Sequence, residues 1–532
     1  MGKQGRAEFA KTTFTTNNSA ADIILTMDFS QLLDGAEVLL LQGSAEIRGL
    51  DYDSRRVRRG FAFIAMRGEK TDGNRYIDQA IAKGAVAIVS DSAEPPRADF
   101  AWAQVVHGRR ALARLSANFY KRPAERLYST GITGTNGKTT TAFILEAILD
   151  AARRKSALVG TVEYHLPGKV TPAPHTTPEP LELMQILSQA VGAGATEVVM
   201  EVSSHALEQQ RVFGVPFDVA VFSNLTRDHL DYHVTFENYF AAKRILFEGC
   251  GTEPPRCAIL NVDDEYGRKL LAFCRGRSRL VYSYGLDSGD FHACNLRMTP
   301  AGNCFRLVTP AGEMEIASPL IGRVNVYNVI AACAAAFARN CTTEQITNGI
   351  LSAARVPGRF ERLNEGQPFT VVVDYAHTDD ALKNLTRAAR EFVNRKDGTI
   401  ARVITVFGCG GDRDRTKRPL MGKAVGEGSD FVVLTSDNPR SEDPEAVMAD
   451  ALPGLQETGT RYATCPDRRE AIRLAMAEAH AGDIVLIAGK GHEKTQTTRE
   501  GISPFDDVEV ARKELHGLGV AGANFSNDHG GK

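Results

Sequence analysis

Hydrophobic and polar positions alternate along this chain in a pattern that predicts three successive α/β regions. Short apolar runs at 61–65 and 85–89 predict buried strands in the first region. Strand-like runs at 158–164, 197–202, 218–224 and 257–262 alternate with helical segments in the second region. Runs at 369–375, 402–408, 431–436 and 483–489 do the same in the third. This alternation is typical of mainly parallel sheets with helical crossovers.

We therefore expect an α/β protein of three domains. An N-terminal α/β domain covers residues 27–125, a central domain with a mainly parallel sheet covers 126–357, and a Rossmann-like, doubly wound domain covers 358–516. Polar, unpatterned tails at 1–26 and 517–532 are expected to be loose. The length agrees, because 532 residues correspond to three or four domains of about 150 residues each.

Composition and charge narrow the class of protein. With 43% hydrophobic and 24% charged residues, the chain is typical of soluble globular proteins. Lys and Arg number 63 against 65 Asp and Glu, which excludes the basic surface of a dedicated nucleic-acid binder. Nine cysteines without a C-x-x-C pair indicate neither a disulfide framework nor a zinc knuckle. No apolar run reaches the roughly 20 residues of a membrane span. A monomer in the cytoplasm is expected.

The most specific motif is a glycine-rich loop at residues 131–139, Gly-Ile-Thr-Gly-Thr-Asn-Gly-Lys-Thr, between a predicted strand and a predicted helix. This arrangement turns backbone N–H groups and a helix N-terminus toward phosphates. Lys138 is expected to face the β- and γ-phosphates of a nucleotide, and Thr139 to ligate Mg²⁺. The loop is a variant, because Ile132 stands where the usual G-x-x-x-x-G-K-[ST] spacing has its first glycine.

Two further positions are candidates for metal binding. Glu201 ends an apolar strand-like run, where it could ligate a metal beside the phosphate loop or form a salt bridge. His229 and His233 have the i, i+4 spacing of some zinc sites. The glutamate of H-E-x-x-H is missing and no third ligand is evident, so zinc is not expected.

Lys243 lies in a predicted helix at 236–247, on the same apolar face as Tyr239 and Phe247. The next residue, Arg244, lies off that face. An amine held among apolar groups loses affinity for its proton, and a neutral lysine can act as a nucleophile toward CO₂. Alternatively, the side chain extends past the aromatic rings to water. The spacing alone is compatible with both interpretations.

Polar clusters follow the four predicted strands of the third region. They lie at 374–377, 410–413, 437–440 and 490–493. Open α/β sheets bind ligands outside the carboxyl ends of their strands, so this region is predicted to bind a ligand.

Taken together, several motifs resemble those of the Mur ligases, which build the peptide stem of peptidoglycan. The resemblance covers roughly residues 27–515 and rests on the phosphate loop, Glu201 to His205, 224–231, 241–243, Asn325 to Asn328, Pro357 to Glu361, and Asp374 to Thr378. One departure is visible: the family usually reads His-Thr-Pro-Asp where this chain has Asp379 in place of the proline. Little effect on the chemistry is expected, because Asp is also favoured near a helix N-terminus.

The resemblance implies roles for individual residues. Glu201 and His229 would ligate Mg²⁺ together with Thr139, and Lys243 would carry a CO₂-derived carbamate that helps to hold a second Mg²⁺. The ATP contacts implied are Gly134, Thr135, Asn136, Gly137, Lys138, Thr139, Thr140, Asn328, Arg359 and Asp374. Contacts to the UDP-MurNAc-dipeptide would come from Ser54 in the first, uridine-binding domain and from Thr176, Thr177, Ser203, Gln209 and Arg211.

Within the family, the run Asp437-Asn438-Pro439-Arg440 resembles the mark of members that use meso-diaminopimelate rather than L-lysine. Diaminopimelate carries a second amino-acid head, whose carboxylate an arginine can hold bidentately. Arg413, Gly489 and Glu493 match the other contacts to that head, with Glu493 pairing with its ammonium.

The resemblance thus implies an ATP-dependent, amide-forming ligase. It would join meso-diaminopimelate to the D-glutamate γ-carboxylate of UDP-MurNAc-L-Ala-D-Glu through an acyl phosphate. Three alternatives stay open at this point. A lysine-adding ligase or folylpolyglutamate synthase should lack the run at 437–440, and a P-loop kinase or GTPase would leave the polar clusters of the third region unexplained. A non-catalytic scaffold would have no need of Lys138, Glu201, His229 and Lys243.

Overall fold

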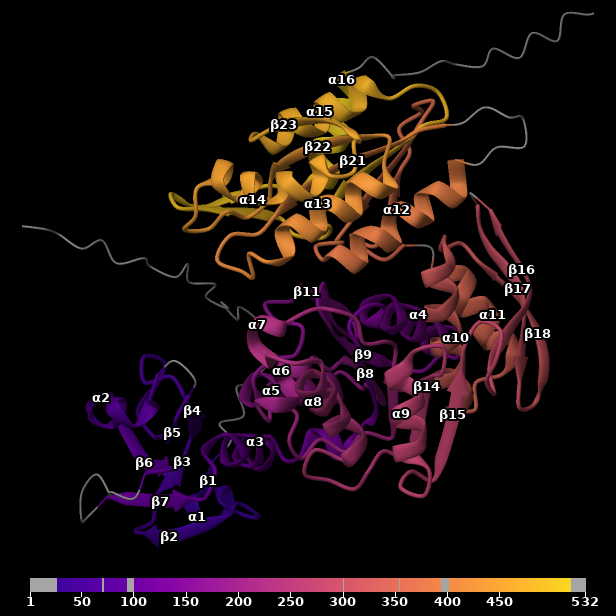
Figure 1. Ribbon diagram of the computed structural model, residues 1–532. Coiled ribbons are helices and arrows are strands. Elements are labelled where there is room, and N and C mark those ends of the chain that lie inside the picture. The colour runs from indigo at the N-terminus through magenta and orange to yellow at the C-terminus, as the bar shows by residue number, and fades with distance from the viewer. Residues whose placement is uncertain are drawn as a thin grey trace, which may run out of the picture. The chain divides into compact units, whose positions relative to one another are not determined.

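A computed structural model describes residues 26–68, 71–92, 100–299, 301–353, 355–393 and 401–517. The chain forms two compact units, divided between Phe119 and Tyr120, and each is described by itself (Figure 1). The loose tails predicted at 1–26 and 517–532 lie outside the described residues, apart from Thr26 and Gly517. In the described part of the chain, every helix is too short or too polar to cross a lipid bilayer.

The first unit contains a five-stranded sheet in the order β2(Val38–Gln42), β7(Ala101–Val105), β6(Ala85–Ser90), β5(Phe61–Ala65) and β4(Gly49–Asp51). Its strands are parallel except for β2. The unit also contains α1(Phe29–Leu32), α2(Ile77–Ala82), α3(Gly108–Phe119), the 3₁₀ turn η1(Gly73–Tyr76), and a small sheet of β1(Met27–Asp28) and β3(Glu46–Ile47). The strands predicted at 61–65 and 85–89 are confirmed.

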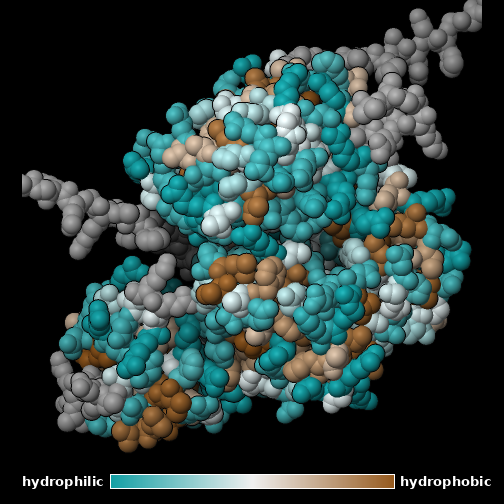
Figure 2. All heavy atoms as spheres, in the orientation of Figure 1, coloured by the Kyte–Doolittle hydropathy of each residue, from teal (hydrophilic) through white to brown (hydrophobic). Residues whose placement is uncertain are grey.

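Strand β2 forms an edge of this sheet and exposes three consecutive leucines. Leu39, Leu40 and Leu41 are 58%, 58% and 52% exposed, and hydrophobic spheres gather on the surface where β2 lies (Figure 2). An edge strand has a partner on one side only, so its side chains have fewer neighbours than those of the central strands.

The second unit begins with η2(Pro123–Arg126) and an eight-stranded sheet in the order β11(Lys169–Pro172), β10(Glu163–Leu166), β9(Ser156–Val159), β12(Glu197–Glu201), β8(Tyr128–Thr133), β13(Val219–Phe222), β14(Cys257–Asn261) and β15(Leu280–Tyr284). The strands from β9 to β15 are parallel. The runs predicted at 197–202, 218–224 and 257–262 each contain one of them.

The single strand predicted at 158–164 is wrong. The chain leaves β9 at Val159, turns, and returns antiparallel as β10. The turn lies against Glu201: Thr161 donates its backbone N–H to Glu201 Oε1 at 2.8 Å, and a Cβ on Gly160 would collide with the same carboxylate oxygen. A tertiary contact, which the local apolar pattern does not encode, therefore divides the run.

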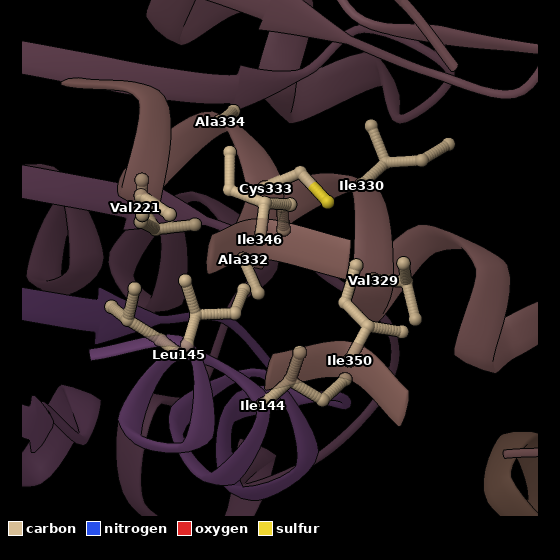
Figure 3. Packing of buried hydrophobic residues seen from close by; sticks show 14 of the residues in the cluster. Ile144, Leu145, Val221, Val329, Ile330, Ala332, Cys333, Ala334, Ile346 and Ile350 are labelled. Carbon is tan, nitrogen blue, oxygen red and sulfur yellow. The ribbon is translucent and has the colours of Figure 1, made fainter. Parts of the chain in front are cut away.

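The helices of this part are α4(Lys138–Ala151), α5(Pro180–Gly192), α6(Ser204–Glu208), α7(Leu230–His233), α8(Phe236–Glu248), α9(Glu265–Cys274), α10(Arg323–Ala338) and α11(Thr343–Ser352). Figure 3 shows Ile144 and Leu145 of α4 packed among residues of α10 and α11 such as Val329 and Ile350, all fully buried. This packing fixes the N-terminus of α4 at the end of β8. A three-stranded antiparallel sheet, β16(His292–Thr299), β17(Gly302–Thr309) and β18(Gly312–Ser318), was not predicted.

The remainder of the second unit contains a six-stranded sheet in the order β19(Glu361–Leu363), β20(Thr370–Asp374), β24(Ile484–Ala488), β21(Val403–Cys409), β22(Phe431–Ser436) and β23(Arg461–Cys465). All strands except β19 are parallel. The four predicted strands are β20, β21, β22 and β24.

Helices cover both faces of this sheet (Figure 1). One core contains side chains of α12(Asp379–Val393), α13(Lys417–Gly428) and α14(Pro444–Gln456), and the other contains side chains of α15(Arg468–Glu478) and α16(Asp507–Gly517). A hairpin of β25(Thr495–Thr498) and β26(Gly501–Pro504) precedes α16. The prediction of a doubly wound sheet is confirmed.

Candidate functional site

The glycine-rich loop connects β8 to α4, as its sequence predicts. Gly134 and Gly137 have φ values of +147° and +89°, which residues with a side chain rarely adopt. A Cβ on Gly137 would collide with Asn328 Oδ1, and a Cβ on Gly134 with Ser223 Oγ. The structure therefore brings Asn328 of α10, which the resemblance gives as an ATP contact, against the loop.

Lys138 opens α4 and folds back over the loop. Its Nζ donates to the carbonyl oxygens of Gly134 and Thr135, each at 2.9 Å. Burial lowers its pKa from the usual range, an effect that the Glu201 carboxylate opposes. The loop thus already holds the ammonium group that would face a nucleotide's phosphates.

Glu201 lies fully buried at the carboxyl end of β12. Its Oε2 accepts hydrogen bonds from the hydroxyls of Thr139 and Thr161, both at 2.9 Å. The side chain is therefore held by two hydroxyls and one backbone N–H, and among the described residues it forms no salt bridge, so the salt-bridge interpretation is wrong there. Thr161 was not singled out in the sequence, because nothing in its local pattern places it beside Glu201.

Lys243 lies in α8 with a side chain that is only 1% exposed, so the interpretation that it extends to water is wrong. Its Nζ donates to Gly134 O at 2.8 Å and lies 4.4 Å from the centre of the Tyr239 ring. Burial holds its pKa well below the usual range, and the nearby positive charge of Lys138 acts in the same direction. Among the described residues, no carboxylate forms a salt bridge with Lys243.

His229 precedes α7 with a φ of +54° and a side chain that is 44% exposed. Its Nε2 lies 3.2 Å from Asp228 Oδ2, and its ring contacts that of His205 edge-on at 4.8 Å. The pKa of His229 is lower than usual, chiefly because the ring is partly removed from water. Within the described ranges, no three His, Cys, Asp or Glu side chains converge as a metal site.

The residues expected at the muramoyl-dipeptide are brought together beside Glu201. Thr177 Oγ1 donates to Glu201 O at 2.8 Å and accepts from Ser203 N at 3.1 Å. Arg211 donates to Thr177 O at 2.9 Å. Gln209 Oε1 accepts a hydrogen bond from Arg211 at 2.7 Å, and the hydroxyls of Thr176 and Thr161 are hydrogen-bonded at 3.1 Å. Ser54 belongs to the first unit, where it donates to Gln79 at 2.8 Å.

Arg359 and Asp374, both expected to contact ATP, lie just before β19 and at the end of β20 in the six-stranded sheet. Arg359 donates to Thr139 Oγ1 at 3.3 Å, which joins this segment to the phosphate loop. Its guanidinium lies 4.7 Å over the Tyr375 ring. Both carboxylate oxygens of Asp374 accept backbone N–H groups, from Phe360 at 2.6 Å and Ala376 at 2.8 Å. Burial raises the pKa of Asp374.

At the carboxyl edge of the six-stranded sheet, Arg440 and Arg413 lie near each other. A Cβ on Gly410 would lie 3.0 Å from Arg440 Nη1 and 3.7 Å from Arg413 Cγ. Arg440 donates to Gly411 O at 2.7 Å, and burial, with the charge of Arg413, lowers its pKa. In the described ranges, neither arginine forms a salt bridge with a carboxylate. Two adjacent cations that form no salt bridge with a carboxylate of the described residues are suited to bind a carboxylate ligand.

Acidic groups lie beside these arginines. Glu493 Oε2 accepts from Asn438 Nδ2 at 2.8 Å and from Lys490 Nζ at 3.2 Å. A Cβ on Gly489 would lie 2.5 Å from Asp437 Oδ2, so glycine is needed for this close approach. The members of the run 437–440, including Pro439, thus share one edge with Arg413, Gly489 and Glu493. The fully buried Lys490 was not predicted as a partner of Glu493.

Three family models match the chain: "Mur ligase family, catalytic domain" at 46–120, "Mur ligase middle domain" at 132–336, and "Mur ligase, glutamate ligase domain" at 358–491. The "UDP-N-acetylmuramoyl-L-alanyl-D-glutamate--2,6-diaminopimelate ligase" of Solibacter usitatus is 54% identical over 89% of this chain and 94% of its own. That of Geobacillus thermodenitrificans is 45% identical over 88% and 95%.

A solved structure with the same description is 34% identical, covers 89% of this chain and 95% of its own, and has a TM-score of 0.63. The three family models match one after another along the three α/β regions, and the relatives are similar over nearly the same length. This chain belongs to the Mur ligase family and has its three-domain α/β fold.

Proposed function

We propose that this ATP-dependent, amide-forming ligase adds meso-diaminopimelate to the D-glutamate γ-carboxylate of UDP-MurNAc-L-Ala-D-Glu during synthesis of the peptidoglycan precursor. The descriptions of the two relatives support this reaction. The observation that carries it is the pair of Arg413 and Arg440, which forms no salt bridge among the described residues and of which Arg440 lies within the electrostatic reach of Glu493.

The distal amino-acid head of diaminopimelate carries charges complementary to those at the carboxyl edge of the six-stranded sheet. Its carboxylate is complementary to the two guanidinium groups, and its ammonium to the carboxylates of Asp437 and Glu493. Asn438 and Pro439 connect Asp437 to Arg440 along the chain, and Gly489 leaves room for Asp437, whose Oδ2 would lie 2.5 Å from a Cβ at that position. L-Lysine has the distal ammonium but no distal carboxylate, so it would leave both arginines unpaired. This difference favours the diaminopimelate-adding activity over the lysine-adding alternative.

ATP serves to activate the D-glutamate carboxylate, which otherwise has no good leaving group. We place the nucleotide on the loop of Gly134, Thr135, Asn136, Gly137, Lys138, Thr139 and Thr140, with Asn328, Arg359 and Asp374 around it. The γ-carboxylate attacks the γ-phosphorus of ATP, the bond to the β,γ-bridging oxygen breaks and ADP leaves, while Lys138 offsets the negative charge that develops there. The amine of diaminopimelate then attacks the acyl phosphate, which forms the amide and releases phosphate.

The donor set near the loop fits Mg²⁺. Thr139 and Glu201 supply a hydroxyl and a carboxylate 2.9 Å apart, and Mg²⁺ in such sites is held by one or two carboxylates plus substrate phosphates. His229 would be a further ligand of this Mg²⁺, and Lys243, as its carbamate, would help to hold a second ion. Bound Mg²⁺ would polarise the phosphate oxygens and neutralise their charge.

The surroundings of Lys243 also fit a carbamate. A buried ammonium near the ammonium of Lys138 is unfavourable, whereas a carbamate would turn this repulsion into attraction. The carbamate nitrogen keeps one hydrogen, which can still be donated to Gly134 O. The same groups argue against a non-catalytic scaffold, because a scaffold gains nothing from a buried lysine held by one carbonyl.

We further propose a division of labour along the chain. Residues 27–125, with Ser54, bind the uridine end of the nucleotide sugar. Residues 126–357 bind ATP and, through Thr176, Thr177, Ser203, Gln209 and Arg211, the muramoyl-dipeptide. Residues 358–516 bind the amino acid. Nine free thiols support a reducing, cytoplasmic location, and we expect a monomer.

The test is phosphate release by the purified protein with UDP-MurNAc-L-Ala-D-Glu, ATP and Mg²⁺, in parallel reactions with meso-diaminopimelate and L-lysine. We expect turnover with meso-diaminopimelate and a tripeptide product of the corresponding mass. Equal or better turnover with L-lysine would identify a lysine-adding ligase, and no turnover with either would favour a scaffold.

A further inference from the structure

A buried ion pair lies directly behind the candidate amino-acid site and has no part in the chemistry proposed above. Arg468, at the start of α15, and Asp507, at the start of α16, both have side chains that are 0% exposed. The two groups pair bidentately, with Nη2–Oδ2 at 2.7 Å and Nε–Oδ1 at 2.8 Å. Burying such a pair costs desolvation energy, so it adds little stability over apolar residues of similar volume. Its remaining hydrogen bonds suggest another purpose.

Those bonds join two strands at the edge where the site lies. Arg468 Nη2 donates to Ala488 O at 3.0 Å, and Nη1 to Ser436 O at 3.5 Å. These carbonyls end β24 and β22, and the next residues along the chain are Gly489 and Asp437. Strands β24 and β22 are not neighbours, because β21 lies between them. No ladder hydrogen bond therefore connects their ends, whereas the single guanidinium of Arg468 does.

Gly489, Asp437 and the guanidinium of Arg468 lie against one another. A Cβ on Gly489 would lie 2.5 Å from Asp437 Oδ2 and 3.9 Å from Arg468 Nη2. Asp507 is the carboxylate that pairs with this guanidinium, and within the described residues Arg468 forms no salt bridge with Asp437 or Glu493. The spacing of these two carboxylates depends on how β22 and β24 end relative to each other.

We propose that Arg468, held in place by Asp507, is a positioning residue that sets the spacing between Asp437 and the Gly489–Glu493 loop, and thereby the recognition of the distal ammonium of diaminopimelate. This inference rests on the proposed function. It differs from the direct contacts proposed above, because Arg468 is fully buried and acts through Asp437 and Gly489.

The test replaces the pair by apolar residues of similar size, in the double variant Arg468→Met/Asp507→Leu, so that no buried charge is left unpaired. The matched control is Arg402→Met/Asp483→Leu. That pair, at 2.8 Å, lies at the opposite, amino ends of β21 and β24. Arg468→Lys is a third variant, which keeps the charge but not the planar fork.

Steady-state kinetics are measured with meso-diaminopimelate and with 2-aminopimelate, which has the distal carboxylate but lacks the distal ammonium. In the Arg468 variants we expect KM for meso-diaminopimelate to rise by about 10- to 100-fold, the loss that accompanies a misplaced hydrogen bond to a charged group. KM for ATP, kcat and KM for 2-aminopimelate should stay near wild type. The control variant should keep the wild-type KM for both amino acids.

Two results would overturn the inference. One is a folded double variant with the wild-type KM for meso-diaminopimelate. The other is an equal rise in KM for both amino acids, because a merely structural role would weaken them alike. If the wild-type protein fails to turn over meso-diaminopimelate at all, the proposed function itself is wrong, and the inference with it.

Discussion

Replacement of Lys243 tests the proposed carbamate. We predict that Lys243→Ala and Lys243→Met abolish most phosphate release, because neither variant has an amine that can bind CO₂. Lys243→Met keeps a side chain of similar length among Tyr239 and its other neighbours, so it separates loss of the amine from loss of packing. The control is Arg244→Ala, at the next position, where the side chain is 41% exposed and paired with Glu248 at 2.8 Å.

The structure sets the scale of each effect. Lys243→Ala removes three methylene groups, which are worth about 0.8 kcal/mol each when buried, so the transfer part of its loss of unfolding free energy is about 2.4 kcal/mol, and the cavity left behind adds to this. Relief of the repulsion with Lys138 offsets part of this. Arg244→Ala should cost about 0.3–0.5 kcal/mol, as exposed i, i+4 pairs do. Loss of a group that stabilises transition-state charge lowers kcat by about 10²–10³-fold.

Two measurements decide the outcome. Phosphate release under saturating substrates should fall by this factor in both Lys243 variants and remain near wild type in Arg244→Ala. NMR of protein equilibrated with ¹³C-bicarbonate should show one carbamate carbon that both Lys243 variants lack. A Lys243→Met variant with near wild-type kcat, or a wild-type protein without that signal, would refute the carbamate role.

Arg440→Lys should raise KM for meso-diaminopimelate by about 10- to 100-fold and leave KM for ATP unchanged, because lysine cannot bind a carboxylate bidentately; an unchanged KM in steady-state kinetics would exclude Arg440 from the amino-acid site. A second prediction concerns acid, which should lower the stability of the loop around Asp412, because Glu442 accepts hydrogen bonds from Asp412 N and from Arg418. The hydrogen bond from Arg418 lowers the pKa of Glu442 from 4.5 to about 2, so its contribution to stability is present above pH 4.5 and is lost as pH falls toward 2. Denaturant titrations should show a smaller loss over this range in Glu442→Gln; equal losses would contradict the ion pair's role.

Much of the fold was predictable because strands and helices follow local patterns. The apolar run at 431–436 corresponds to β22 over the same residues, and the loop before Lys138 joins a strand to a helix as its glycines require. Where tertiary contacts dominate, the prediction failed. The run at 158–164 divides because Gly160 and Thr161 must turn around Glu201. The antiparallel sheet of β16–β18 consists of short, mixed runs that have no single period.

The candidate site divides in the same way. The order of Asp437, Arg440 and Glu493 after their strands predicted one shared edge, since the carboxyl ends of parallel strands meet there. The state of Lys243 could not be predicted, because a helical face does not reveal what packs against it; the structure places Gly134 O and Tyr239 there. The buried Arg468 could not be predicted either, because its partners are far away in the sequence.

The choice of amino acid tests the central claim most directly. In competition for the same UDP-MurNAc-L-Ala-D-Glu and ATP, the purified protein should incorporate meso-diaminopimelate in clear preference to L-lysine, as read by the mass of the tripeptide product. That result would fit a distal carboxylate bound between Arg413 and Arg440. Preferential incorporation of L-lysine would contradict the account, because it would mean that the two unpaired guanidinium groups do not select the substrate.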